Sequence, residues 1–160
     1  MYNSCTMKYF AYGMNTNTAQ MATRCPKAQS LGQATLMGHE FRFARHADII
    51  PNPEFITRGV LWEITPDCEL ALDALEGYPA YYLKKMVRVF HNGKSVECMT
   101  YYMTGDLPDE YPTDGYLEML MEGYKEHGVD NTQLYSSLLL IQQIEKRRVE
   151  AEKTYFHYFN

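Results

Sequence analysis

The stretch GVLWEITPDCELALDALEGYP, which runs from Gly59 to Pro79, contains a strand followed closely by a helix. Its first residues are rich in β-branched and aromatic side chains, which favour strands. After Pro66, apolar residues recur at helical intervals. These residues are Cys68, Leu72 and Leu75. Gly77 suits the left-handed position after a helix end, and the proline beyond it prevents continuation, so the helix is predicted to stop there.

Glu76 lies in the last turn of this predicted helix, on the rim of its apolar face. The carbonyl groups at a helix C-terminus disfavour a carboxylate, and so does partial burial. Both effects raise the pKa of Glu76, whereas Asp73 points largely away from the apolar face. On these residues alone, Glu76 is either a proton carrier or an edge glutamate that reaches water.

The composition limits the class of protein. The chain has 160 residues, 46% of them apolar, which is enough for a single domain over residues 1–160 with a proper core. The net charge is −5 and no basic stripe is present, so nucleic acid is not an expected partner. No apolar run approaches the roughly 20 residues of a membrane span. Because the N-terminus also lacks a charged-then-apolar leader, we expect a cytoplasmic protein without a membrane partner.

The cysteines and histidines give no sign of a metal site. No pair of cysteines has metal-ligand spacing, and the histidines are scattered. The cysteines are Cys5, Cys25, Cys68 and Cys98. We therefore expect structural or reduced thiols and no metal. A cysteine hydrolase fits poorly, because Cys25 immediately precedes Pro26 and has no histidine near it in the pattern.

Strand signals along the rest of the chain are separated by turns and loops. They cover residues 7–13, two strands within 31–45 that bend at Gly38, and two strands within 82–103. Asn92-Gly93 is a strong signal for a hairpin turn between the last two. Residues 48–54, which contain two prolines, and the acidic residues 105–113 are expected to be loops.

Three further helices are predicted. The first is capped within residues 16–18 and ends near Pro26, and the second covers 116–126 and stops near Gly128. Residues 131–160 form a C-terminal helix and an aromatic tail, which we expect to pack back on the body. Because strands and helices do not alternate regularly, the order of elements indicates an α+β domain with a strongly curved, mixed or mostly antiparallel sheet.

The turn after the first strand reads Tyr12-Gly13-Met14-Asn15-Thr16. A glycine at a strand-to-helix junction lets backbone N–H groups face one point, and the following helix N-terminus adds positive potential there. Such a nest suits a carboxylate or a developing oxyanion. Many strand–helix turns contain glycine, so this turn alone does not specify a function.

Five segments taken together resemble a known family. They read Tyr12-Gly13-Met14-Asn15-Thr16, Arg24-Cys25-Pro26-Lys27-Ala28, Leu31-Gly32-Gln33-Ala34-Thr35-Leu36-Met37-Gly38, Gly59-Val60-Leu61-Trp62 and Leu72-Asp73-Ala74-Leu75-Glu76-Gly77. They resemble the γ-glutamylcyclotransferase-like family, which includes the AIG2-like proteins. The resemblance spans residues 7–130, including Tyr101 and the helix after the acidic loop. It implies a barrel-like core with flanking helices.

The resemblance also implies an intramolecular reaction without metal or cofactor. The α-amine of a small γ-glutamyl substrate attacks its own γ-carbonyl, which closes 5-oxoproline and releases an amine or amino acid. Glu76 is expected to be the general base and acid. The substrate-binding residues are expected to be Tyr12, Gly13, Met14, Asn15 and Tyr101. Tyr101 would bind the substrate or orient Glu76.

Two departures from the family pattern bear on this expectation. Met14 replaces the family's serine, and Thr16 replaces its leucine. If the turn binds through backbone N–H groups, Met14 changes the shape of the pocket and leaves the nest in place. The alternative is a non-catalytic module that binds a small metabolite or a protein on the same fold. Arg45 and Arg58 are candidates to pair with a substrate carboxylate, although surface roles are expected for both.

Overall fold

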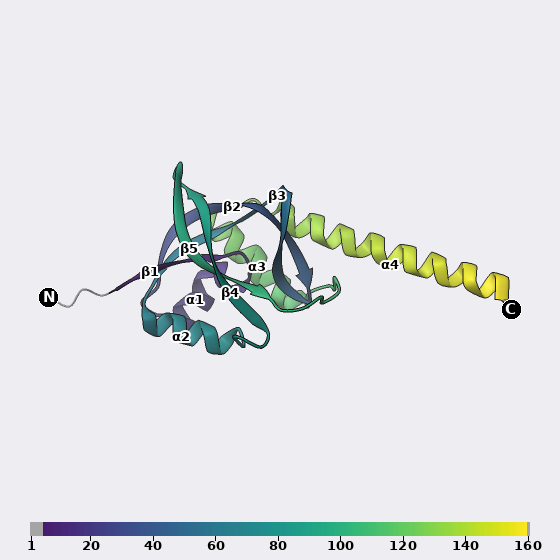
Figure 1. Cartoon of the computed structure of the whole chain (residues 1–160), viewed down its shortest axis with the longest axis horizontal. Helices are drawn as coiled ribbons and strands as arrows, with labels where there is room; N and C mark the ends of the chain where they lie inside the picture. Colours follow the sequence, from purple (N-terminus) through teal and green to yellow (C-terminus); the bar gives the residue numbers. More distant parts are fainter. Residues whose placement is uncertain (1–4, 160) are drawn as a thin grey trace.

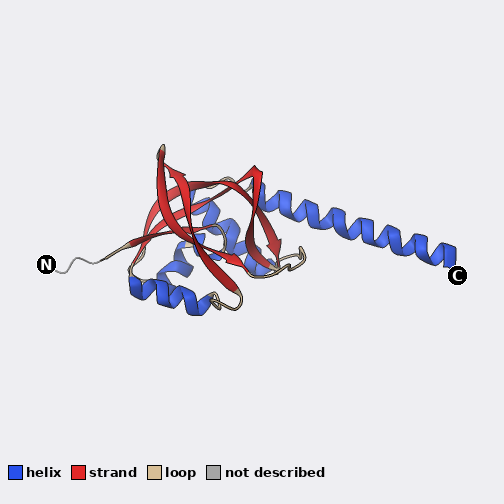
Figure 2. Ribbon diagram, in the orientation of Figure 1, coloured by secondary structure: helices blue, strands red, loops and turns tan. Residues whose placement is uncertain are grey.

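Five strands close into a barrel in the computed structural model, which describes residues 5–159 (Figures 1 and 2). They are β1 (Met7–Ala11), β2 (Gln29–Ala44), β3 (His46–Ile64), β4 (Tyr82–His91) and β5 (Lys94–Met103). Their order around the barrel is β1-β3-β2-β4-β5. The parallel contact of β1 with β5 at Tyr9 and Met99 closes the barrel, and the other pairs are antiparallel. The α+β class with a mixed, barrel-forming sheet is confirmed.

The strand–helix stretch folds as predicted at both of its ends. The strand is the last part of β3, where Val60, Leu61 and Ile64 are fully buried. The helix is α2 (Pro66–Leu75), and the side chain of Thr65 caps it by accepting a hydrogen bond from the N–H of Cys68. Leu75 differs from the prediction, because it is 47% exposed and not part of the core.

The prediction of two strands within residues 31–45 is wrong, because β2 is one strand and the bend predicted at Gly38 is a bulge inside it. β2 runs continuously through this position, and its register with β3 shifts between Met37 and His39. Gly38 has a φ of 68°, a left-handed conformation that glycine adopts without steric cost. The second predicted turn, at Asn92-Gly93, connects β4 and β5 as expected, with positive φ at both residues.

The loop predicted at residues 48–54 is wrong, because these residues belong to β3. Asp48 is buried, and it accepts hydrogen bonds from the N–H of Met103 and from Arg42 Nε, both at 2.9 Å. Pro51 lies opposite His39 of β2, while β1 pairs with β3 only further along, at Val60–Ile64. Proline is tolerated on a strand edge of this kind, because no neighbouring strand needs its N–H.

Helices α1 (Thr18–Arg24) and α3 (Asp114–His127) pack around a short 3₁₀ turn, η1 (Met14–Thr16). Asn17, within the predicted capping residues, caps α1 by accepting from the N–H of Gln20. α3 ends at Gly128, which has a φ of 65°. Where α3 meets η1 it carries Gly123, and a Cβ there would collide with Thr16. The glycine therefore allows α3 to approach the turn closely.

Helix α4 (Thr132–Phe159) corrects the expectation for the aromatic tail. The tail does not pack back on the body, because α4 continues without interruption and projects away from the barrel (Figure 1). Leu134, Ser137 and Ile141 are buried at its base, and every residue from Gln142 to Phe159 is exposed. The helix contains no glycine or proline that could turn the chain. Within residues 5–159, no helix combines the length and apolarity needed to span a membrane.

A disulfide between Cys25 and Cys68 corrects the expectation of reduced thiols for these two residues. It joins the end of α1 to the first turn of α2, across a sequence separation of 43 residues. The partners are adjacent in space only because the barrel brings the two helices together. Cys5 and Cys98 are free, the first exposed and the second buried. The cytoplasmic location stays a prediction.

Candidate active site

A cavity of about 220 Å³ opens at one end of the barrel. The residues predicted for substrate binding and Glu76 all line it, so the structure brings the predicted site together. Much of the cavity wall is aromatic. The six tyrosines that line it are Tyr9, Tyr12, Tyr81, Tyr82, Tyr101 and Tyr116. Within residues 5–159, no three His, Cys, Asp or Glu side chains are grouped as a metal site.

Glu76 is placed by the way α2 ends. Its N–H donates to the carbonyl of Leu72 at 2.8 Å, and Gly77 follows with a φ of 63°. The N–H of Tyr78 then donates to the carbonyl of Asp73 at 3.0 Å, which together with the glycine makes a Schellman-type helix end. This local chemistry reverses the chain directly after Glu76, so the carboxyl is held at the cavity wall.

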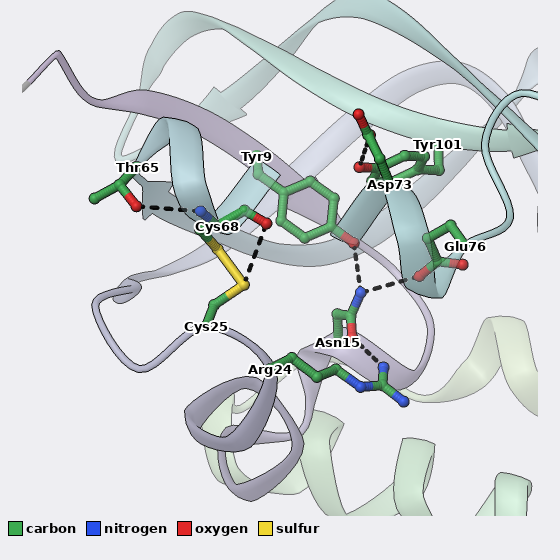
Figure 3. The surroundings of a disulfide bond; sticks show 9 residues. All are labelled: Tyr9, Asn15, Arg24, Cys25, Thr65, Cys68, Asp73, Glu76 and Tyr101. Carbon is green, nitrogen blue, oxygen red and sulfur yellow. Dashed lines mark hydrogen bonds between the residues drawn. A yellow bond between two sulfur atoms is a disulfide. The ribbon is translucent and has the colours of Figure 1, made fainter. Parts of the chain in front are cut away.

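The carboxyl of Glu76 belongs to a chain of polar contacts that starts at α1 (Figure 3). Asn15 Nδ2 donates to Glu76 Oε1 at 3.1 Å and to the hydroxyl of Tyr9 at 3.0 Å. Arg24 in turn donates from Nη1 to Asn15 Oδ1. Asn15 is buried, and these partners fix the direction of its amide. The amide therefore presents a donor to Glu76 and connects it to a guanidinium.

Burial raises the pKa of Glu76 to about 7, against the opposing effects of Arg24 and of the hydrogen bond from Asn15. A carboxyl with a pKa near neutrality can accept a proton in one step and return it in another. Burial likewise raises the pKa of the cavity tyrosines Tyr9, Tyr101 and Tyr116, so their hydroxyls stay protonated.

Tyr101 contacts a different carboxylate from the one expected. Its hydroxyl donates to Asp73 Oδ1 at 2.6 Å (Figure 3). Lys84 Nζ lies 2.9 Å from Asp73 Oδ2 and also 2.9 Å from Glu69 Oε1, so the aspartate is itself held in place. Asp73 thus ties α2 to β5 beside the cavity. Its place three residues before Glu76, one helical turn away, is the sequence signal that could have indicated this role.

Part of the backbone of the turn at residues 12–16 makes no hydrogen bond within the described part of the chain. The N–H groups of Thr16 and Asn17 donate within the turn. Those of Gly13, Met14 and Asn15 have no hydrogen-bond partner within residues 5–159. A Cβ on Gly13 would lie 2.9 Å from Cβ of Ala47 and 3.2 Å from the hydroxyl of Tyr116, so a side chain there would crowd the wall.

The cation of the cavity wall is Arg24, which sequence reasoning did not single out for this role. Arg45 and Arg58, the candidates considered, are exposed and do not line the cavity. His46 was also missed. Its Nδ1 lies 2.7 Å from the hydroxyl of Tyr81 at the cavity wall, and burial lowers its pKa. The sequence contained a signal for Arg24. Because the short helix α1 starts directly after the turn at residues 12–16, a residue in its last turn stays close to that turn.

Residues 9–125 match the family described as Gamma-glutamyl cyclotransferase, AIG2-like. The chain belongs to this family. The family is one of enzymes that act on small γ-glutamyl compounds, and the matched range contains every residue of the predicted site. Helix α4 lies beyond its end. None of the curated proteins matches the chain.

Solved structures of the γ-glutamyl cyclotransferase fold superimpose on most of the chain. A protein described as a gamma-glutamyl cyclotransferase has a TM-score of 0.75 at 26% identity, covering 82% of this chain and 86% of its own. An uncharacterized protein from Homo sapiens also has a TM-score of 0.75, at 27% identity, with coverage of 81% and 85%. A glutathione-specific enzyme from yeast, at 14% identity and a TM-score of 0.57, shares the fold over 82% of this chain and 95% of its own.

Proposed function

We propose that this member of the family is an active γ-glutamyl cyclotransferase that releases 5-oxoproline from a small γ-glutamyl compound. The observation that supports it best is that one cavity is lined both by Glu76, with a pKa of about 7, and by residues 13–15, whose N–H groups have no partner within residues 5–159. The cavity is smaller than the roughly 300–1,000 Å³ typical for drug-sized ligands. Its size suits a γ-glutamyl group, with the leaving group extending toward solvent.

The reaction begins with proton removal. The carboxylate of Glu76 takes a proton from the substrate's α-ammonium, and the resulting amine attacks the γ-carbonyl carbon to form a five-membered ring. Negative charge then develops on the former carbonyl oxygen. The N–H groups of residues 13–15 are the donors that would stabilise this oxyanion, in the manner of an oxyanion hole.

The second proton transfer completes the reaction. Protonated Glu76 donates to the nitrogen of the leaving amine, and the bond from that nitrogen to the γ-carbon breaks as the carbonyl re-forms. The ring nitrogen still carries one proton too many, and this proton passes through Glu76 to the released amine. The amine leaves as an ammonium ion, 5-oxoproline keeps one N–H, and Glu76 returns to its carboxylate form. The cavity's aromatic walls hold the flexible γ-glutamyl chain in a folded geometry, which is worth up to about 7–11 kcal/mol in an intramolecular reaction. Arg24 supplies the positive charge that attracts the substrate's α-carboxylate. Backbone donors carry the anion contacts, so Met14 is compatible with activity.

The test is 5-oxoproline release from a panel of γ-glutamyl amines and amino acids by the wild type and by Glu76→Gln. Removing the proton carrier should lower kcat by about 10²–10⁴-fold, while substrate binding measured by calorimetry is retained. Glu97→Gln on β5, an exposed glutamate, is the matched control and should leave turnover unchanged. Tight binding by the wild type without release of 5-oxoproline would instead assign a binding function to the site.

A further inference from the structure

The outer part of α4, which we call the distal helix (residues 142–159), carries large apolar side chains on an exposed helix. Tyr155, Phe156, Tyr158 and Phe159 are between 61% and 76% exposed. Soluble proteins rarely leave a contiguous apolar surface of this kind uncovered. Most helical stability in proteins comes from tertiary packing, and every side chain of the distal helix is exposed. The distal helix therefore has the properties of an interaction surface.

Two of these four side chains, Tyr155 and Tyr158, continue a regular pattern that begins where α4 contacts the barrel, and Phe156 and Phe159 lie off it. The buried residues there are Leu134, Ser137 and Ile141, spaced by three and then four positions. The same alternation reaches five residues of the distal helix. They are Ile144, Arg148, Ala151, Tyr155 and Tyr158. This is the a and d spacing of a coiled coil, so these residues form one seam that the barrel covers at its base and leaves exposed beyond.

Arg148 lies in the middle of the seam and discriminates between two orientations of a self-paired helix. In a parallel pair, each a residue faces its own counterpart, so two Arg148 guanidinium groups would meet in the seam. In an antiparallel pair, a residues face d residues. Arg148 then faces Ala151 of the second copy, whose small side chain leaves room for it, and Glu152 of that copy lies next to the guanidinium. The small size of Ala151 and the separation of the two guanidinium groups thus both favour the antiparallel pair.

The same antiparallel register pairs the apolar seam residues. With Arg148 opposite Ala151, Ile144 of each copy faces Tyr155 of the other, so each of these layers joins an aliphatic to an aromatic side chain. The distal helix points away from the barrel (Figure 1), so the two barrels would lie at opposite ends of the pair. A second copy of this chain therefore matches the exposed seam layer by layer from Ile144 to Tyr155.

We propose that the distal helix is a homodimerisation element, in which two copies of this chain form an antiparallel coiled coil along the seam. The match to the family ends at residue 125, so this element lies outside the matched residues. The proposal does not depend on the proposed catalytic function, because no seam residue lines the cavity.

The first test compares two double variants of the full chain by sedimentation equilibrium. Ile144→Lys with Tyr155→Lys places charge in the seam, at residues that are 44% and 61% exposed. The control, Val149→Lys with Phe156→Lys, makes the same changes off the seam at residues that are 42% and 62% exposed. The wild type should dimerise reversibly, the seam variant should raise the dimer Kd by at least about 100-fold, and the control by less than about fivefold. Near-UV circular dichroism verifies that each barrel stays folded. Equal effects of the two variants, or a monomeric wild type, would overturn the proposal.

The second test determines orientation by cross-linking in a Cys5→Ser background. Ile144→Cys and Tyr155→Cys proteins should form disulfide-linked dimers when mixed, and neither should do so alone. Cross-linking of each alone would indicate a parallel pair and overturn the antiparallel proposal. A wild type that stays monomeric and sediments with phosphatidylcholine–phosphatidylglycerol vesicles would assign the apolar face to a membrane surface instead.

Discussion

The carboxyl of Glu76 is subject to opposing influences from its surroundings. Burial raises its pKa to about 7, whereas Arg24 and the amide of Asn15 stabilise the charged form and lower it. Arg24 acts partly through Asn15, to which it donates a hydrogen bond. The protonation state of the proposed base therefore depends on residues from three elements: η1, α1 and the end of α2.

The first residue-scale prediction is the pH dependence of turnover. Glu76 must be ionised in the free enzyme to accept the α-ammonium proton, so kcat/KM should fall as the pH drops below about 7. A profile measured over about pH 5–9 checks this, with the acidic limb reporting the pKa of the free enzyme. A limb near the ordinary glutamate value would show that Glu76 is not the group that titrates.

The same pKa shift predicts a pH-dependent difference in stability between Glu76→Gln and the wild type. The folded pKa of about 7 is above the ordinary value of 4.5, so the folded state binds this proton more tightly. Its stabilising contribution is complete below the ordinary value and is lost as the pH rises through about 7. Between about pH 4 and 8, the free energy of unfolding should shift in favour of Glu76→Gln by up to about 3 kcal/mol. Urea denaturation measures it, and a pH-independent difference would contradict the shift.

A third residue-scale prediction concerns Arg24. Arg24→Gln removes the nearby positive charge, so the pKa of Glu76 should rise. The acidic limb of the pH profile should shift to higher pH by the same amount. Arg24→Lys keeps the positive charge, so the pKa of Glu76 in this variant should lie closer to the wild-type value than it does in Arg24→Gln. Carboxyl carbon chemical shifts followed by NMR provide a readout independent of turnover. Arg45→Gln, at an exposed arginine outside the cavity, is the control and should leave the profile unchanged.

At the scale of elements, the nest depends on how closely α3 packs against η1. Gly123→Ala places a Cβ against Thr16 and the N–H of Asn17, and should destabilise the protein by about 1–3 kcal/mol. Gly115→Ala on the same helix is the matched control, because its Cβ would have no atom within 4 Å. Thermal denaturation of both variants measures the difference. Equal stability of the two would show that the contact is not tight.

The disulfide between Cys25 and Cys68 connects the two helices that carry Arg24 and Glu76. A cross-link over 43 residues restricts the unfolded chain, and its loss should cost about 2–4 kcal/mol. Denaturant unfolding of a Cys25→Ser, Cys68→Ser double variant tests this. Cys5→Ser, at an exposed free cysteine, should leave stability unchanged. A double variant as stable as the wild type would show that the bond contributes nothing under the conditions used.

At the scale of the whole molecule, barrel closure assembles the cavity. The parallel contact between β1 and β5 brings the start of the chain next to its last strand, so Tyr9 and Tyr101 meet with ring centroids 5.8 Å apart. Closure also sets the end of α2 opposite the turn that follows β1. Residues 12–15 and Glu76, far apart in sequence, thereby share one cavity wall.

The sequence by itself determined the features that depend on neighbouring residues. The end of α2 at Glu76 and Gly77, the hairpin at Asn92-Gly93 and the bend at Gly38 all follow from local backbone preferences, and each is present. The short family motifs, each a continuous run of residues, were likewise sufficient to predict which residues line the cavity. Local signals of this kind survive folding because they depend on the backbone within one or two turns.

Only the tertiary structure decided the features that depend on long-range contacts. Prolines at residues 51 and 53 indicated a loop, but a strand edge there requires no N–H from them. Three features join segments that only barrel closure brings together. They are the place of Arg24, and not Arg45 or Arg58, in the cavity wall, the Cys25–Cys68 bond, and the contact of Tyr101 with Asp73. Helix α4 combines both kinds of feature. Its a and d pattern is a local property of the sequence. The exposure of the distal helix is a property of the tertiary structure, because the barrel covers only the base of α4.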